Sequence, residues 1–208
     1  MSDIVIEKFY EWKRGLTSVK AAVNIFEKVR DIPFAVIPEL FRLEKGPREM
    51  LVLNRGFCVP KHYLMGMFFE RMDFPVRYCT YPFLWKDLDV AYPEDVRRYA
   101  GKIPVSYHLA LKAKIGGKWL FIDGTWDPPL AQEGFPVNTG WEGKDDMLNA
   151  VEPLEEIVND SAIERDRLFL EKLRNYSLSE KLNLARFSVE LNRWLEEVRN
   201  KKGAANGA

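Results

Sequence analysis

The stretch Val105-Ser106-Tyr107-His108-Leu109-Ala110-Leu111-Lys112, continued by Ile115-Gly116-Gly117-Lys118 and Trp119-Leu120-Phe121-Ile122-Asp123, has the most regular pattern in the chain. Apolar and non-apolar residues alternate in its first part, which is typical of a β-strand. The paired glycines supply the positive φ angles of a primed two-residue turn, and an apolar series returns after them. This stretch predicts an antiparallel hairpin. With helical patterns on both sides of it, the chain is expected to have an α+β fold.

The register of the hairpin predicts that His108 and Asp123 lie on one face. With Gly116 and Gly117 in the turn, counting outward places His108 opposite Thr125 and diagonal to Asp123. Diagonal neighbours lie about 7 to 8 Å apart at the backbone, which these two side chains can span. A carboxylate beside an imidazole fixes its tautomer and raises its basicity. Because a slip of one residue would move Asp123 to the apolar face, Asp127 is the alternative orienting carboxylate.

Cys58 stands directly before a second fold-defining segment, the apolar helical pattern from Pro60 to about Met72. Proline suits the first turn of a helix, so Cys58 is expected at or just before a helix start. Free backbone N–H groups and the positive end of the helix dipole favour a thiolate there. The alternative is a buried thiol that packs as a small apolar group. We interpret Cys79, in the predicted strand 76–81, as such a structural thiol.

The composition limits the classes of function. The chain has 208 residues, of which 47% are hydrophobic and 30% charged, as in ordinary globular proteins. Lysine plus arginine equal aspartate plus glutamate at 31 each, so no net field attracts nucleic acid or a membrane. Residues 1–12 carry several charges and lack the apolar core of a signal peptide. The two cysteines form no disulfide framework, and a cytoplasmic location is expected.

Helices are expected at both ends of the chain. Residues 3–12 and 18–29 carry apolar residues at helical spacing, and the segment 34–43 is expected to be short and irregular. The two motifs Ser161-Ala162-Ile163-Glu164 and Ser177-Leu178-Ser179-Glu180 are capping boxes, each predicting a helix start. The second helix has an apolar stripe that predicts packing on the core or on a second copy, as a homodimer. The stripe consists of Leu184, Phe187, Leu191, Leu195 and Val198.

We therefore expect a single domain over residues 1–202. Its core spans about 47–140, its helical flanks are 1–46 and 150–202, and residues 203–208 form a disordered tail.

Four pieces in order resemble a transglutaminase-like domain, of the papain-related Cys-His-Asp superfamily. They are Val52-Leu53-Asn54-Arg55-Gly56-Phe57-Cys58, then Met72-Asp73-Phe74-Pro75-Val76-Arg77-Tyr78, which resembles the family's Gly-Ile-Pro-Ala-Arg stretch, then His108, and finally Lys118 to Thr125. The chain departs from the family in having Leu109 and Ala110 after the histidine and Asp123-Gly124-Thr125 where Asp-Pro-Thr is common. The resemblance implies a papain-like core, in which the helix carrying the nucleophile packs on an antiparallel sheet.

The resemblance implies cysteine-dependent acyl chemistry on a peptide or other amide. Cys58 is the expected nucleophile, His108 the proton donor and acceptor, and Asp123 the orienting carboxylate. Hydrolysis is the expected reaction, with transfer of the acyl group to an amine and a silent binding module on the same fold as the alternatives. The Cys58 N–H would contribute to an oxyanion hole, with Asn54 as the candidate for the second donor.

Further residues are candidates for the cleft. Trp85 and Trp126 are expected in the substrate cleft, and Tyr92, Tyr99 and Trp141 are further aromatic candidates that packing explains equally well. No cofactor and no metal are expected. A zinc site of Cys58, His62, His108 and Asp123 is the weaker alternative, since the spacing of Cys58 and His62 is a weak signal. Otherwise His62 lies near the cleft or is a satisfied core histidine.

Overall fold

The computed structural model describes residues 3–205 as a helical layer on a four-stranded antiparallel sheet, which confirms the expected α+β class. The strand order is β3-β2-β1-β4. The strands are β1 (Val76–Phe83), β2 (Ser106–Ile115), β3 (Lys118–Ile122) and β4 (Ile157–Asn159). The α-helices are α1 (Ile4–Lys13), α2 (Ser18–Arg30), α3 (Gly46–Leu53), α4 (Cys58–Glu70), α5 (Glu94–Ala100), α6 (Ala162–Arg174) and α7 (Leu178–Ala205). Short 3-10 turns are η1 (Pro38–Phe41), η2 (Trp85–Asp87) and η3 (Pro128–Glu133).

The hairpin has the predicted register. Ile115 pairs with Lys118, and the ladder of β2 and β3 continues to Leu111 opposite Ile122. Gly116 and Gly117 have φ angles of 59° and 84°, as a primed two-residue turn requires. Because β3 ends at Ile122, the chain leaves the ladder just before Asp123.

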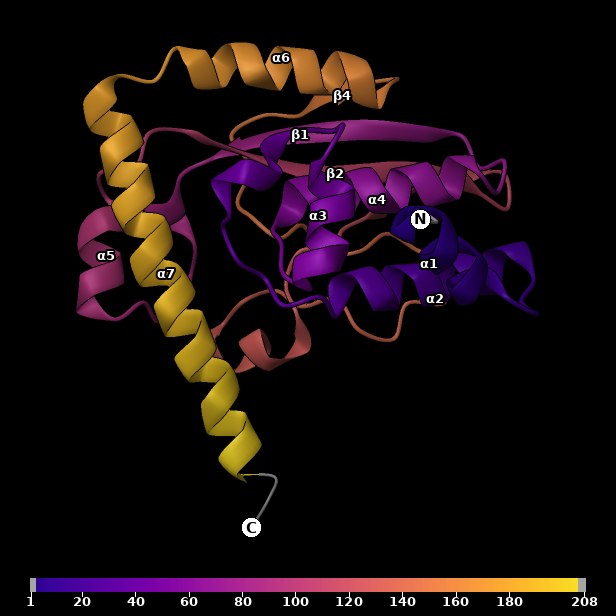
Figure 1. Ribbon diagram of the computed structural model, residues 1–208, viewed down its shortest axis with the longest axis horizontal. Coiled ribbons are helices and arrows are strands. Elements are labelled where there is room, and N and C mark those ends of the chain that lie inside the picture. The colour runs from indigo at the N-terminus through magenta and orange to yellow at the C-terminus, as the bar shows by residue number, and fades with distance from the viewer. Residues whose placement is uncertain (1–2, 206–208) are drawn as a thin grey trace.

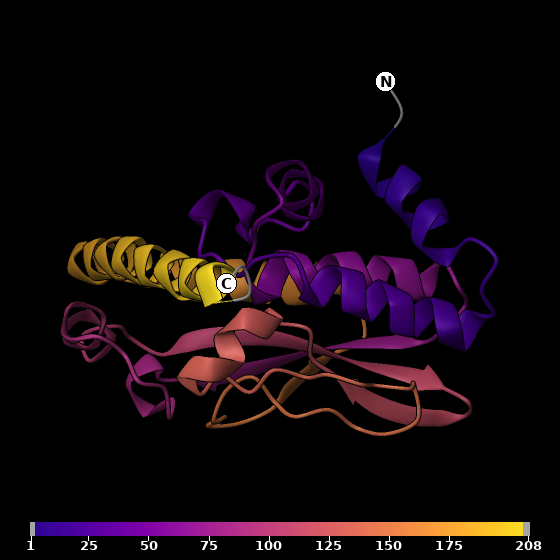
Figure 2. The same ribbon diagram turned by 90° about the horizontal axis from the view of Figure 1, so that it is seen from below.

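Helix α4 packs along the sheet and is apolar almost all round, which is typical of a buried helix. A Cβ atom at Gly66 would lie 2.5 Å from the hydroxyl oxygen of Tyr78 on β1, so only glycine lets helix and sheet approach this closely. Figures 1 and 2 show α2, α4 and α7 in one layer against one face of the sheet.

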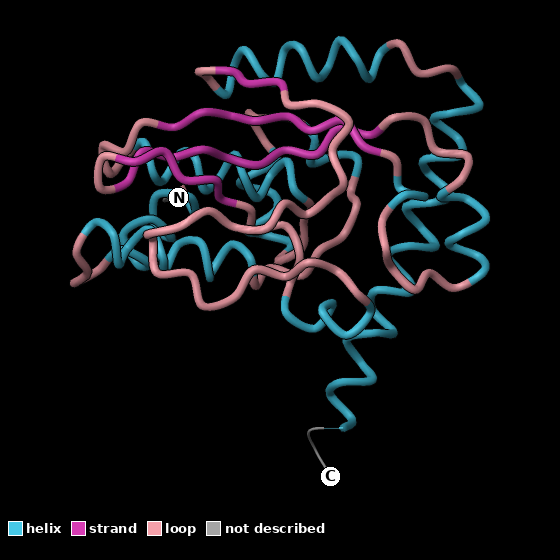
Figure 3. Tube along the Cα trace, turned by 180° about the vertical axis from the view of Figure 1, so that it is seen from behind, coloured by secondary structure: helices cyan, strands magenta, loops and turns pink. Residues whose placement is uncertain are grey.

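Irregular chain covers the other face of the sheet, as Figures 2 and 3 show. The N–H of Met147 donates to Phe121 (3.1 Å), and the N–H of Leu154 donates to Pro82 (2.8 Å), which attaches this segment to the strands. His108 and Ala110, on the less apolar face of the alternating pattern, are therefore buried as well, with exposures of 1% and 0%. Both faces of β2 are therefore buried around His108 and Ala110.

The flanking helices begin largely where the sequence predicts. Ser161 accepts the N–H of Glu164 (3.2 Å), and Ser177 accepts the N–H of Glu180 (3.3 Å) while donating its hydroxyl to the Glu180 carboxylate (2.6 Å). Four of the five stripe residues on α7 are fully buried against the protein itself, and Leu184 is half-buried. The stripe packs on the core, and the homodimer remains a prediction.

Several elements were not predicted. Helix α3 begins at Gly46 with Pro47 in its first turn, α5 spans Glu94–Ala100, and β4 pairs with β1 through only three residues. Helix α7 runs to Ala205, so the first three residues of the expected disordered tail are helical, and residues 206–208 lie outside the described part. Among residues 3–205, the helices are too short or too polar to span a bilayer.

Candidate active site

Cys58 is the first residue of α4, as predicted, and its thiol is partly exposed. The preceding backbone is fixed by hydrogen bonds from Ala35 N–H to Gly56 (2.8 Å) and from Gly56 N–H to Pro33 (3.1 Å). Phe57 is the extended N-cap residue, and no side chain caps the first turn. The helix start therefore presents uncapped backbone donors beside the sulfur, which suits a group that becomes negative.

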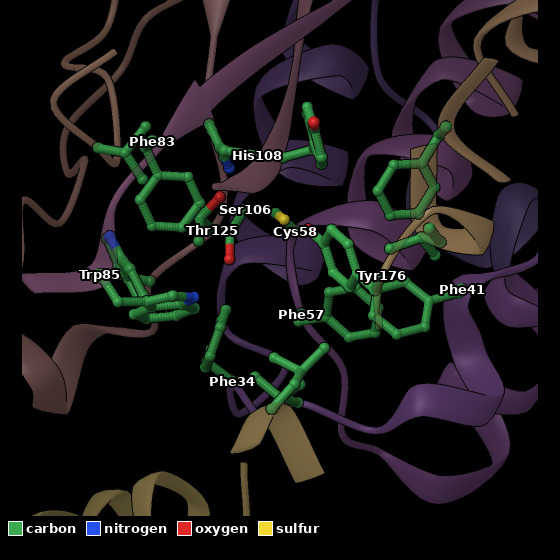
Figure 4. Close-up of a pocket in the computed structure, with 17 residues that line it drawn as sticks. Phe34, Phe41, Phe57, Cys58, Phe83, Trp85, Ser106, His108, Thr125 and Tyr176 are labelled. Carbon is green, nitrogen blue, oxygen red and sulfur yellow. The ribbon is translucent and has the colours of Figure 1, made fainter. Parts of the chain in front are cut away.

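His108 and Asp123 come together as the hairpin register predicts. The Nε2 atom of His108 lies 2.8 Å from Oδ2 of Asp123, and both side chains are buried. The Cys58 side chain lies close enough to the same imidazole to help raise its pKa. Since Nε2 is bonded to the carboxylate, Nδ1 is the ring atom that remains for the sulfur. Figure 4 shows the Cys58 sulfur in the middle of a pocket with the His108 ring beside it.

The electrostatics favour a charged imidazole. Burial alone lowers the pKa of His108, but the charge and hydrogen bond of Asp123, together with Cys58, outweigh it and raise that pKa to about 10. Burial alone would raise the pKa of Asp123, yet the charge and hydrogen bond of His108 hold it well below its ordinary value. At neutral pH the pair is therefore an imidazolium and a carboxylate.

The Asp123 carboxylate has a complete set of hydrogen bonds. Its Oδ1 accepts the N–H (3.1 Å) and the hydroxyl (2.6 Å) of Thr125, and its Oδ2 accepts the N–H of Ala150 (2.8 Å) as well as His108. These bonds fix the orientation of the carboxylate toward the imidazole. The role of Ala150 has no signal in the sequence, because a backbone N–H from a distant loop supplies it.

His62 is a satisfied buried histidine rather than a free ligand. Its Nδ1 donates to the carbonyl oxygen of Cys58 (2.8 Å), and its Nε2 accepts the N–H of Gly124 (3.0 Å), which fixes a neutral tautomer. Burial lowers the pKa of His62 to about 4 despite the opposing charge of Asp123. Both ring nitrogens are in use, and among residues 3–205 no group of His, Cys, Asp and Glu has the arrangement of a metal site. The zinc alternative is therefore not supported.

Lys61 makes a second connection between α4 and the segment after β3. Its ammonium donates to the carbonyl oxygens of Arg30 and Thr125, each at 2.9 Å, and it is fully buried. Burial lowers the pKa of Lys61 to about 7, against the opposing charge of Asp127. The sequence does carry a signal for this buried lysine, because Lys61 stands inside an otherwise apolar helical run. The prediction of the site did not include it.

The pocket beside the thiol contains some of the predicted cleft residues and excludes others. Cys58, His108, Trp85 and Trp126 all line it. Asn54 does not: it is the exposed, left-handed C-cap of α3 (φ 49°), so its assignment as an oxyanion donor is wrong. Three of the aromatic candidates are also outside it, namely Tyr92, Tyr99 and Trp141.

The contacts of Asp127 and the burial of Cys79 show what these two residues do. Asp127 forms a two-pronged ion pair with Arg199 of α7, at 2.8 Å for both contacts, and also accepts the N–H of Phe34 (2.8 Å). Asp127 therefore ties the C-terminal helix to the core and does not orient His108. Cys79 is fully buried, and burial raises its pKa to about 11, which fits the predicted structural thiol.

The chain has a distant structural resemblance to a known protein. No protein-family model matches the chain, and no curated protein matches it. Among solved structures it is similar to "a Putative Cysteine Protease from Cytophaga hutchinsonii", with 17% sequence identity and a TM-score of 0.41. The match covers 62% of this chain and 39% of that chain.

Proposed function

We propose that the protein is a cysteine-dependent enzyme that breaks an amide bond through an acyl-thioester intermediate. The observation that carries this proposal is the buried His108–Asp123 pair in the same pocket as the Cys58 thiol, which stands at a helix start. The sheet with a helix whose first residue is the nucleophile corresponds to a papain-like or transglutaminase-like core.

The first step forms the thioester. The Cys58 sulfur, as a thiolate paired with the His108 imidazolium, attacks the carbonyl carbon, and the developing oxyanion lies near the N–H of Cys58 at the helix start. His108, protonated at neutral pH, gives its proton to the departing nitrogen, and the carbon–nitrogen bond breaks. Asp123 keeps the imidazole in position and stabilises its positive charge.

The second step releases the acyl group. Water attacks the thioester carbonyl, His108 takes the proton of the water, and the Cys58 sulfur leaves as a thiolate. We favour water over an amine as acceptor, so the enzyme is a protease or amidase. Transfer to an amine requires the same residues and differs only in this step.

A second oxyanion donor is needed once Asn54 is excluded, and we assign it to Trp85. Its side chain lines the pocket, and its indole N–H makes no hydrogen bond within the described residues. The indole N–H of Trp126 already donates to Ala150 (3.0 Å), and the Thr125 hydroxyl donates to Asp123. The indole N–H of Trp85 is therefore available to a substrate oxygen.

A screen of peptides, simple amides and amine acceptors tests the proposal, with Cys58→Ala as the matched control. We expect turnover by the wild-type protein and none by the variant. Product masses with and without an added primary amine distinguish hydrolysis from transfer. The proposal fails if the variant turns over substrate as fast as the wild type. It also fails if no substrate reacts and iodoacetamide labels Cys58 no faster than in the urea-unfolded chain, which would indicate a binding module.

A further inference from the structure

The pocket beside the thiol has two aromatic walls. In the first, named the Trp85 wall, ring centroids of Phe83 and Trp85 lie 5.2 Å apart, and those of Phe34 and Trp126 lie 4.3 Å apart. Trp85 and Trp126 join these pairs at 6.4 Å. Figure 4 places Phe83 and Trp85 to one side of Cys58.

The second wall, named the Phe169 wall, consists of Phe41, Phe57, Tyr107 and Phe169. Phe41 lies 4.7 Å from Phe57 and 5.6 Å from Phe169 between ring centroids, and Tyr107 lies 6.2 Å from Phe169. In Figure 4 Phe41 is on the opposite side of Cys58 from Trp85. A substrate carbonyl at the sulfur therefore lies between two apolar surfaces.

Apart from the His108 imidazolium, the described residues of the pocket offer no charged partner for a substrate group. Within the described part of the chain, its lining residues include no aspartate, glutamate, lysine or arginine. Two of its hydroxyls are already in use, because Thr125 donates to Asp123 (2.6 Å) and Tyr176 donates to the carbonyl oxygen of Val105 (2.5 Å). Burying an unpaired charge is strongly unfavourable, whereas burying apolar area is favourable.

We infer that the site selects acyl donors with an uncharged aromatic or branched aliphatic group next to the reacting carbonyl, and rejects donors with a carboxylate or ammonium group there. This inference rests on the proposed function and names its substrate class. Among the described lining residues, the one charged group is the imidazolium of His108, which the Asp123 carboxylate already pairs.

The C-terminal helices complete the pocket and give a place to alter this selectivity. Leu173 of α6 and Leu184 of α7 line it and are only half-buried, so they lie nearer the solvent than Phe169. A charge introduced at Leu184 would supply the missing partner without entering the core.

The test compares N-acetyl p-nitrophenyl esters of phenylalanine, alanine, glutamate and lysine, which share one leaving group. Rates are corrected for the reaction with Cys58→Ala. We expect kcat/KM for the phenylalanine ester to exceed that for alanine at least ~10-fold, and alanine to exceed glutamate and lysine at least ~10-fold. Equal rates, or faster reaction of a charged ester, overturn the inference while Cys58-dependent turnover leaves the proposed function intact. If no ester shows Cys58-dependent reaction, both fail.

A charge swap provides the second test. Leu184→Lys should raise the ratio of the glutamate rate to the phenylalanine rate at least ~10-fold, because the new ammonium pairs with the substrate carboxylate in a poorly solvated site. The matched control is Leu182→Lys, also on α7 but 52% exposed and outside the pocket, which should leave the ratio unchanged. An unchanged ratio in a folded Leu184→Lys protein contradicts the inference. Should that variant not fold, the ester series with the wild-type protein decides alone.

Discussion

The Nε2 atom of His108 and the Oδ2 atom of Asp123 lie 2.8 Å apart inside the protein, where neither side chain is more than 1% exposed. Their separation along the chain is that of a hairpin with a two-residue turn, so the turn at Gly116 and Gly117 sets the geometry of the proposed catalytic pair. Because a buried charge without its partner is unfavourable, the two residues depend on each other for stability as well as chemistry.

Replacing Asp123 by asparagine tests this pair. The amide keeps the size of the carboxylate but cannot both keep its bonds to Thr125 and Ala150 and accept from His108, so the imidazolium loses its charged partner and its fixed orientation. We expect kcat/KM to fall by about 10 to 10³, less than in a serine triad because the thiol is the better nucleophile. The free energy of unfolding should also fall by about 1 to 3 kcal/mol, since buried hydrogen bonds are lost. Steady-state kinetics and urea unfolding measure both.

The control for this change is Asp127→Asn. Asp127 binds Arg199 and the N–H of Phe34, so its loss should lower the urea midpoint while a folded sample keeps nearly full kcat. The opposite pattern, with a silent Asp123→Asn and an inactive but folded Asp127→Asn, would remove Asp123 from its proposed role.

Trp85→Phe tests the second oxyanion donor. Phenylalanine keeps an aromatic wall but removes the indole N–H, so kcat should fall by about 10 to 10³ with little change in KM, as for other oxyanion donors. Trp126→Phe is the matched control, because its indole N–H is bound to Ala150 and not to substrate. A rise in KM with kcat unchanged would mean that Trp85 contributes to binding or packing and does not stabilise the oxyanion.

His62 should make stability depend on pH. Its pKa is about 4 in the folded protein and 6.5 in an unfolded chain, so between these values the unfolded state binds a proton that the folded state does not. Stability is therefore lost as the pH falls from 6.5 toward 4, by up to about 1.4 kcal/mol per pH unit from this group.

His62→Gln isolates that effect, because glutamine can also donate to Cys58 and accept from Gly124 but does not titrate. The difference in unfolding free energy between the variant and the wild type should shift in favour of the variant as the pH falls below 6.5. Titrations of groups that do not interact with His62 cancel in this difference, and its charged neighbours Asp123, His108 and Lys61 are present in both proteins. The difference is measured by urea unfolding from pH 7.5 to 4.5. A constant value would mean that folding does not lower the pKa of His62.

The helix caps predict modest, purely structural effects. Ser161→Ala and Ser177→Ala each remove a hydroxyl that accepts a backbone N–H, and each should cost about 0.5 to 2 kcal/mol. Activity should change little. Unfolding midpoints that do not move in either variant would show that the caps do not stabilise α6 and α7.

The sequence predicts those parts of the molecule that depend on local rules. Alternation and paired glycines specify the hairpin and its register, and Pro60 with an apolar run specifies a helix at Cys58. The contacts that complete the site come from distant segments without a local signal: the Ala150 N–H on Asp123, the Arg199 side chain on Asp127 and the burial of Lys61. Asn54 was misassigned because it was chosen for its closeness to Cys58 in sequence. In the structure it is the exposed, left-handed C-cap of α3 and lies outside the pocket.

The central claim is that Cys58 carries the acyl group, and trapping that intermediate tests it most directly. The protein is mixed with N-acetylphenylalanine p-nitrophenyl ester, quenched in acid, and examined by intact mass and peptide mapping. We expect one acyl group per chain, attached to Cys58 and released by hydroxylamine. It should be absent from Cys58→Ala and should form more slowly in His108→Ala. An acyl group on Cys79 or on lysines, or equal labelling of Cys58→Ala, would contradict it.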